Sequence, residues 1–172
     1  AEIELIEMSN REQRLKDALA PVADRYDYIL IDCPPSLSLL TINGLIAGRN
    51  GVLIPVQCEY LALEGLGQLT QTLTRVRTSL FPNLQVRGVI LTMYDGRTRL
   101  ALDVVGEVRK YFPEKVFQTI IPRSIRLAEA PSYGQPITLY APDSTAARSY
   151  AALAREILDQ DGIHIPAFSE EG

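Results

Sequence analysis

The first candidate metal-binding residue is Asp32, because it directly follows the apolar run Tyr28–Ile31. If that run is a buried strand, the carboxylate of Asp32 lies at the strand end, where ligands of parallel sheets bind. Magnesium usually keeps several waters, so one carboxylate suffices to anchor it beside a nucleotide phosphate. Pro34 and Pro35 fix φ and stiffen the residues that follow. Alone, the motif is a weak signal, because an aspartate at a strand end is more often a cap or turn residue.

Two arginines form a second candidate site. Arg97 follows the apolar run Val86–Thr92, and Arg126 follows Val116–Ile121. From Arg97 to Arg126 there are seven lysines and arginines against three acidic residues, although the whole chain carries a net charge of −4. Arginines on neighbouring strand-end loops can each meet a phosphate, which gives sequence-independent, salt-sensitive binding. The alternative for both is a solvated surface charge or a local salt bridge.

Buried strands alternating with helices are expected to position these residues. Runs that are apolar on both faces predict parallel strands at Tyr28–Ile31, Gly51–Val56, Val86–Thr92 and Val116–Ile121. Helices are predicted at Ser9–Ala20 (with Ser9 as N-cap) and Ser38–Ala47, and around the apolar stripes Leu66–Leu80, Leu100–Val108 and Tyr150–Ile157. Ile3–Ile6 fits a short strand or a chain-start remnant. The fold class is therefore α/β, a doubly wound, mostly parallel sheet with helices on both faces.

Composition is that of a single globular domain. The chain has 172 residues, 47% of them hydrophobic and 22% charged, and no apolar stretch is long enough to span a bilayer. We expect one domain over residues 1–160, a loose tail over 161–172, no signal peptide and a cytoplasmic location. Cys33 and Cys58 are interpreted as buried thiols, and His164 has no expected metal partners.

Six blocks, in order, resemble the ParA/Soj family of chromosome and plasmid partition ATPases. They are YDYILIDCPPS (26–36), LLTIN (39–43), IPVQCEY (54–60), ALEGL (62–66), LTMYDGRT (91–98) and IPRSIRLAEAPS (121–132). The resemblance covers about Ile3 to Leu158. It implies a P-loop NTPase-like fold, ATP and magnesium as cofactors, and segregation through ATP-dependent dimerisation and non-specific DNA binding. The implied partners are a second copy and a ParB-like centromere-binding protein, on the nucleoid and with no membrane.

The resemblance also implies roles for individual residues. Asp32 would be the Walker B carboxylate that holds magnesium through water, with Pro34 in the adjoining switch segment. The adenine base would be bordered by Thr92, Met93 and the loop Pro122, Arg123 and Ser124. Arg97 and Arg126 would contact DNA. Glu64 fits a helix cap or the dimer face. Asn43 fits either a helix-interior polar residue or one turned toward the nucleotide, and Tyr94 and Tyr133 are expected to pack.

The chain departs from the family pattern in two places. No GxxxxGK[ST] run, nor the family's variant of it, occurs in these residues, and the run YAPDSTAA (140–147) lacks the arginines that family members commonly carry there. Backbone N–H groups of that glycine-rich loop cradle the phosphates. We therefore expect this chain alone not to hydrolyse ATP and to bind no cofactor tightly. In the family the strand that leads into this loop is central, so its absence predicts that the chain self-associates through exposed sheet edges, pairs with a separate N-terminal piece, or closes its sheet differently.

Two alternative functions stay open from the sequence. The first is a non-catalytic interaction module, or a split-gene product, that binds only a partner or DNA. The second is a septum-positioning relative of the MinD type. It needs a basic amphipathic helix at the C-terminus, whereas residues 159–172 are acidic and contain Pro166.

Overall fold

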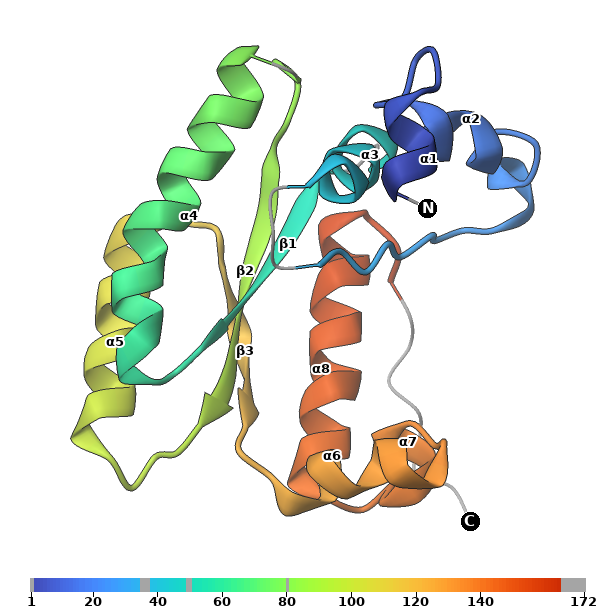
Figure 1. The fold of residues 1–172 in the computed structure, drawn as a ribbon. Coiled ribbons are helices and arrows are strands. Elements are labelled where there is room, and N and C mark those ends of the chain that lie inside the picture. Colours follow the sequence, from blue (N-terminus) through green and yellow to red (C-terminus); the bar gives the residue numbers. More distant parts are fainter. Residues whose placement is uncertain (1, 35–37, 49–50, 80, 165–172) are drawn as a thin grey trace. The chain divides into compact units, whose positions relative to one another are not determined.

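The structure is a computed structural model that describes residues 2–34, 38–48, 51–79 and 81–164. Its helices are α1 (Glu2–Ile6), α2 (Arg14–Leu19), α3 (Leu39–Ala47), α4 (Tyr60–Ser79), α5 (Arg99–Tyr111), α6 (Ile125–Glu129), α7 (Ile137–Tyr140) and α8 (Thr145–Gln160), and its strands are β1 (Val52–Gln57), β2 (Val86–Tyr94) and β3 (Val116–Pro122) (Figure 1). Short 3-10 turns span Ala23–Arg25 and Ala130–Tyr133.

The described residues divide into two compact units. One comprises the described parts of Ala1–Leu53 and Gly67–Arg87, and the other those of Ile54–Leu66 and Gly88–Gly172. The expected division into a domain over residues 1–160 and a tail stays a prediction. Within the part of the chain that the structure describes, no helix is long and apolar enough to cross a membrane.

The three strands form one sheet in the order β1-β2-β3. β2 and β3 run parallel, with Val89 opposite Val116 and Tyr94 opposite Pro122. The sheet and its three strands confirm the predicted α/β class, because each strand coincides with a predicted apolar run. In the second unit, α5 and α8 lie on opposite sides of the β2–β3 pair, so this part of the sheet is covered on both faces (Figure 1).

The second unit is built around a close contact between β2 and β3. Phe117 of β3 is only 1% exposed, and its ring lies against Gly88 of β2, where even a Cβ atom would come within 2.2 Å of it. On α5, Ala101, Val104 and Val108 are buried. Leu100, which the predicted stripe included, is 42% exposed, because the buried face begins one residue later.

In the first unit, α1 and α2 pack on α3. The side chain of Asn43 on α3 is 3% exposed and bridges these segments: it accepts the N–H of Leu15 at 3.0 Å and donates to the carbonyl oxygens of Arg11 (2.7 Å) and Leu39 (2.9 Å). Asn43 is thus a buried polar residue turned toward the 11–15 segment. Satisfying irregular main chain in this way lets a short helix dock without a regular first turn.

Two predictions for the first 20 residues are wrong. Glu2–Ile6 is a helix, whereas a short strand was one expectation for Ile3–Ile6. The helix predicted over Ser9–Ala20 is restricted to Arg14–Leu19, with Gln13 at its N-cap. The physical reason is Asn10, whose φ of 54° lies in the left-handed region and interrupts any helix that starts at Ser9.

The predicted strand Tyr28–Ile31 is also wrong. In the structure this segment has no strand assignment, and Ile29 and Leu30 are 39% and 84% exposed. A strand that is apolar on both faces needs neighbours in a sheet to bury it, and among the described residues the sheet consists of β1, β2 and β3 only. The segment instead borders a cavity of about 290 Å³, which is also lined by Leu19 of α2, Ala47 of α3 and Leu53 of β1.

Candidate functional site

In the first unit, Asp32 lies in a segment fixed by α3. The next residue, Cys33, places its Sγ where a Cβ on Gly44 would come within 2.5 Å, so only glycine allows this approach. Thr41 donates its hydroxyl to the carbonyl oxygen of Pro34 at 3.3 Å. Burial, with a smaller contribution from the charge of Asp32, raises the pKa of the Cys33 thiol and keeps it neutral. α3 therefore holds both residues that follow Asp32.

The Asp32 carboxylate is exposed. The described residues contain no cluster of three or more histidine, cysteine or acidic side chains that could enclose a metal ion. An exposed single carboxylate does fit magnesium, which takes one protein ligand and completes its shell with water and phosphate oxygens. The carboxylate is not at the end of a formed strand, because Tyr28–Ile31 does not join the sheet.

In the second unit, the carboxyl ends of all three strands are tied together. Cys58, just after β1, donates its N–H to the carbonyl oxygen of Thr92 at 2.8 Å, and the Thr92 hydroxyl donates to the Val56 carbonyl oxygen at 3.4 Å. The N–H of Arg123 donates to the carbonyl oxygen of Tyr94 at 2.9 Å. The structure thus brings the predicted adenine-border residues of β2 and of the Pro122–Ser124 loop to one end of the sheet.

Met93 has a backbone conformation that few residues adopt. Its φ is 55°, in the left-handed region, which is uncommon for a residue other than glycine, asparagine or aspartate. Such strain persists only where neighbouring bonds hold it, and it concentrates at functional sites. Here the bonds made by Thr92 and Tyr94 on either side hold the strand end.

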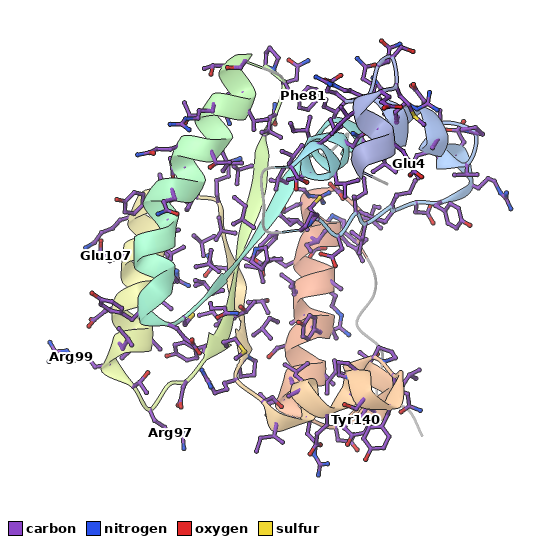
Figure 2. All side chains as sticks on the ribbon, in the orientation of Figure 1. Glu4, Phe81, Arg97, Arg99, Glu107 and Tyr140 are labelled. Atoms are coloured by element: carbon purple, nitrogen blue, oxygen red, sulfur yellow. The ribbon has the colours of Figure 1, made fainter. Side chains whose placement is uncertain are left out.

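Beyond this strand end lies a pocket of about 490 Å³ lined by three arginines, Arg97, Arg123 and Arg126, together with Tyr94, Asp95, Gly96 and Ile125. The two arginines predicted to contact DNA therefore do converge. Figure 2 shows the side chain of Arg97 projecting outward from this end of the second unit, and it is 88% exposed. A pocket lined by three guanidinium groups suits an anionic ligand.

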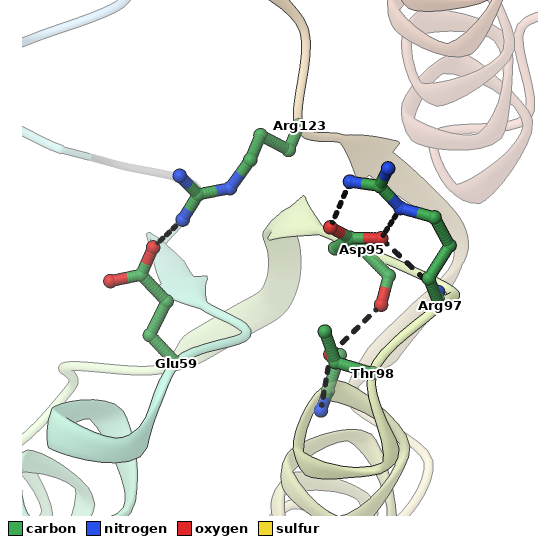
Figure 3. Close-up of polar contacts among 6 residues, drawn as sticks. Glu59, Asp95, Arg97, Thr98 and Arg123 are labelled. Carbon is green, nitrogen blue, oxygen red and sulfur yellow. Dashed lines mark hydrogen bonds and ion pairs between the residues drawn. The ribbon is translucent and has the colours of Figure 1, made fainter.

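Each of the three arginines has a carboxylate partner. Asp95 accepts from Nε of Arg97 at 2.9 Å and from its terminal nitrogen at 2.7 Å, which is a two-bonded pair (Figure 3). Arg123 pairs with Glu59, two residues after the end of β1. Arg126 pairs with Glu129 at 3.3 Å, one turn along α6. The local salt bridge proposed as the alternative for Arg97 and Arg126 is therefore present for both.

The loop that carries Arg97 is rigidly built. Asp95 accepts the N–H of Arg97 at 3.1 Å, and Thr98 donates its hydroxyl to the Asp95 carbonyl oxygen at 3.0 Å while it caps α5 by accepting the N–H of Ala101. The side-chain hydrogen bonds from Arg97 lower the pKa of Asp95 from its ordinary 3.8 to about 2. A lowered carboxyl pKa means that the charged form is favoured, so this pair is intact at every pH well above 2.

Glu129 joins Arg126 to an aromatic pair. It accepts from the hydroxyl of Tyr140 at 3.0 Å, and the ring of Tyr140 stacks on that of Tyr133 with centroids 5.0 Å apart. Burial and the bond to Glu129 raise the pKa of Tyr140, so it stays a neutral donor. Tyr133 packs against this ring as expected, yet it is 68% exposed.

Sequence reasoning missed the acidic partners. Asp95 stands two residues before Arg97, a spacing that allows the aspartate side chain to bond the main chain two residues on. That signal was available, whereas the Glu59–Arg123 pair joins residues 64 positions apart and had none. The expectation for Glu64 concerns a side chain outside the described residues.

Comparison with known proteins gives a family for this arrangement. The family model for an AAA domain matches residues 1–86. The chain is 55% identical over 161 residues to the chromosome partitioning protein ParA of Myxococcus xanthus, covering 94% of this chain and 56% of that protein. It is 57% identical over 157 residues to the sporulation initiation inhibitor protein Soj of Bacillus subtilis, covering 91% of this chain and 62% of that protein. The chain belongs to the ParA/Soj family of P-loop NTPases.

Solved structures agree with the fold of this ParA/Soj-family chain. Cobyrinic acid a,c-diamide synthase from Mycobacterium smegmatis with bound ADP and magnesium has a TM-score of 0.70 and 34% sequence identity to it, covering 98% of this chain and 62% of that one. The predicted P-loop NTPase-like fold class is thereby confirmed. The chain spans between about half and two thirds of the length of the curated relatives it matches.

Proposed function

We propose that this chain is part of a partition ATPase that acts in chromosome or plasmid segregation through ATP-dependent dimerisation and non-specific DNA binding. The observation that carries the proposal is the convergence of Arg97 and Arg126 on one pocket at the strand ends of the second unit. The family membership supports it, because relatives over 50% identical across most of the chain are named as partitioning proteins.

DNA binding is proposed for the arginine pocket. Arg97 and Arg126 each meet a backbone phosphate, and neither reads a base, so affinity is independent of sequence and falls with salt. Rigid attachment supports this role, since the bonds of Asp95 and Thr98 fix the Arg97 loop and a fixed loop loses little entropy on binding. Association with the nucleoid and with a ParB-like protein belongs to the same proposal.

Nucleotide binding is proposed for two sets of residues. Asp32, with Pro34 beside it, holds magnesium through water, and Thr92, Met93, Pro122, Arg123 and Ser124 border the adenine through main-chain groups and apolar contact. ADP and magnesium are bound in the similar solved synthase, which supports both cofactors. When bound, they supply the phosphoryl-transfer chemistry. This chain's own residues anchor the ion at Asp32 and orient the base through the bonded strand ends.

The proposal includes a limit on nucleotide affinity. The 172 residues contain no GxxxxGK[ST] run, whose N–H groups and lysine contribute most phosphate contacts. We expect the isolated chain to hydrolyse no ATP and to bind it no more tightly than about 1 mM. Isothermal titration calorimetry that gave micromolar affinity would overturn this limit.

Self-association is proposed through the unpaired edge of β1 and the exposed apolar segment that includes Leu30, because neither is covered by another strand among the described residues. Size-exclusion chromatography with light scattering tests it, and a stable monomer at high concentration would contradict it.

The test of DNA binding compares two charge-matched double variants. Arg97→Ala/Arg126→Ala removes both proposed contacts, whereas Arg109→Ala/Lys115→Ala removes two exposed charges near the opposite end of β3. With a fluorescent 30-base-pair duplex at about 50 mM salt, we expect the first variant to lose most of its affinity and the second to retain it. Equal losses in the two variants would rule out the arginine pocket as the DNA-binding surface.

A further inference from the structure

We infer that Asp95 and Glu129 compete with DNA phosphates for Arg97 and Arg126, and so hold the affinity of the arginine pocket below what the arginines alone would give. This inference rests on the proposed DNA binding and assigns a limit on its affinity to two acidic residues. It predicts that removing a negative charge from either residue strengthens binding.

The geometry of the Asp95–Arg97 pair is that of a competitor. Both oxygens of Asp95 are engaged by Nε and a terminal nitrogen of Arg97, which is the edge of the guanidinium that grips a phosphate with two parallel bonds. A phosphate can displace the carboxylate from this edge or take the remaining N–H groups of an arginine whose charge is already compensated. Either route costs affinity.

Glu129 stands in the same relation to Arg126 by a looser contact. Its Oε2 lies 3.3 Å from the guanidinium and 3.0 Å from the hydroxyl of Tyr140. The tyrosine bond holds the carboxylate in place beside the arginine when the arginine moves. Because Arg126 is 62% exposed and Glu129 40% exposed, the arginine is free to turn toward DNA.

The size of the effect follows from the exposure of the pairs. Solvent-exposed ion pairs contribute little, and their usual range corresponds to about 1.4- to fivefold in an equilibrium constant, with a two-bonded arginine pair toward the upper end. We therefore expect each neutralised acid to tighten DNA binding by about two- to fivefold at low salt. Because the amide variants contact the same two phosphates as the wild type, the slope of log K against log salt should change by less than the about 0.9 that one additional phosphate contact contributes.

Isosteric amides separate this role from a structural one. Asp95→Asn keeps an oxygen to accept the N–H of Arg97, the bond that shapes the loop. Glu129→Gln keeps an acceptor for Tyr140. Glu107→Gln is the matched control, since Glu107 forms an exposed pair with Lys110 at 2.6 Å, on α5 and outside the pocket (Figure 2). All three changes remove one negative charge.

The experiment uses fluorescence anisotropy to measure the affinity of the full 172-residue chain for a labelled duplex of about 30 base pairs. The salt concentration runs from about 25 to about 200 mM, which brackets 0.1 M, where the screening length is about 10 Å. We expect Asp95→Asn and Glu129→Gln to bind more tightly than the wild type, and Glu107→Gln to match the wild type. Binding by the amide variants without binding by the wild type would also support the competition, although it would contradict DNA binding by this chain in its natural form.

Three results would overturn the inference. If the wild-type chain binds DNA through its arginines, unchanged or weaker binding by the amide variants would refute the competition and leave the proposed function standing. Equal tightening of DNA binding by Glu107→Gln would show that the change in net charge, and not the release of an arginine, causes the gain in affinity. Failure of every variant, amides included, to bind at 25 mM salt would overturn the inference together with the proposed DNA binding.

Discussion

The contact between Gly88 and Phe117 allows a quantitative prediction about the unit that carries the arginine pocket. In Gly88→Ala the new Cβ would lie 2.2 Å from Cε2 and 2.7 Å from Cζ of the ring, whereas carbon atoms prefer separations of about 3.5 to 4.0 Å. Phe117 must therefore move by more than about 1 Å, and as it is 1% exposed it has no free space to enter. We expect the free energy of unfolding to fall by about 2–3 kcal/mol.

Urea denaturation followed by circular dichroism measures this change, and three further variants control it: Gly106→Ala, Phe117→Leu and Gly88→Ala/Phe117→Leu. Gly106→Ala is the matched glycine, because a Cβ there meets nothing within 4 Å and α5 should gain about 0.5–1 kcal/mol of stability. In Gly88→Ala/Phe117→Leu the removed ring atoms relieve the clash, so the double variant should be more stable than the sum of the single effects by at least about 1 kcal/mol. Strict additivity would refute the steric explanation.

Three further predictions concern single side chains. Glu156 of α8 accepts two consecutive main-chain N–H groups of β3 at 2.6 and 3.0 Å, so Glu156→Ala should lower stability in urea by about 1–2 kcal/mol, and an unchanged midpoint would exclude the bond. Asn43→Ala strips a buried acceptor from the N–H of Leu15, and hydrogen exchange of that amide should accelerate at least tenfold while the amides of β3 keep their rates. By NMR titration Asp95 should have a pKa of about 2, so its pair with Arg97 is complete above about pH 4 and is lost as the pH falls through 2. In Arg97→Ala the pKa of Asp95 should rise toward 3.8. A pKa still near 2 in that variant would assign the shift to another cause.

The sheet was predictable because its strands carry their own signal. Runs such as Val52–Val56 and Val86–Thr92 are apolar on both faces, and only a covered parallel sheet buries both faces of a strand. The same rule failed at Tyr28–Ile31, which has the composition of a central strand but is not a strand in the structure. Apolar composition reports what a segment would bury, while a strand also needs a partner for its main-chain bonds.

The arginine pocket was predictable only in part. Placing Arg97 and Arg126 after consecutive strands put them at one end of the sheet, because parallel strands share a direction. Their pairing with Asp95 and Glu129 depends on side-chain rotamers and on the turn at α6, which apolar periodicity does not encode. β3 also contains a bulge, where four residues span the register that two span in β2, and there Glu156 of α8, a helix distant in sequence, accepts two main-chain N–H groups.

The salt dependence of DNA binding tests most directly whether the arginine pocket is a phosphate-binding surface. The slope of log K against log salt should be shallower in Arg97→Ala/Arg126→Ala than in the wild type by about 1.8, or about 0.9 for each lost phosphate contact. Parallel slopes for the two proteins, whatever their absolute affinities, would contradict the account.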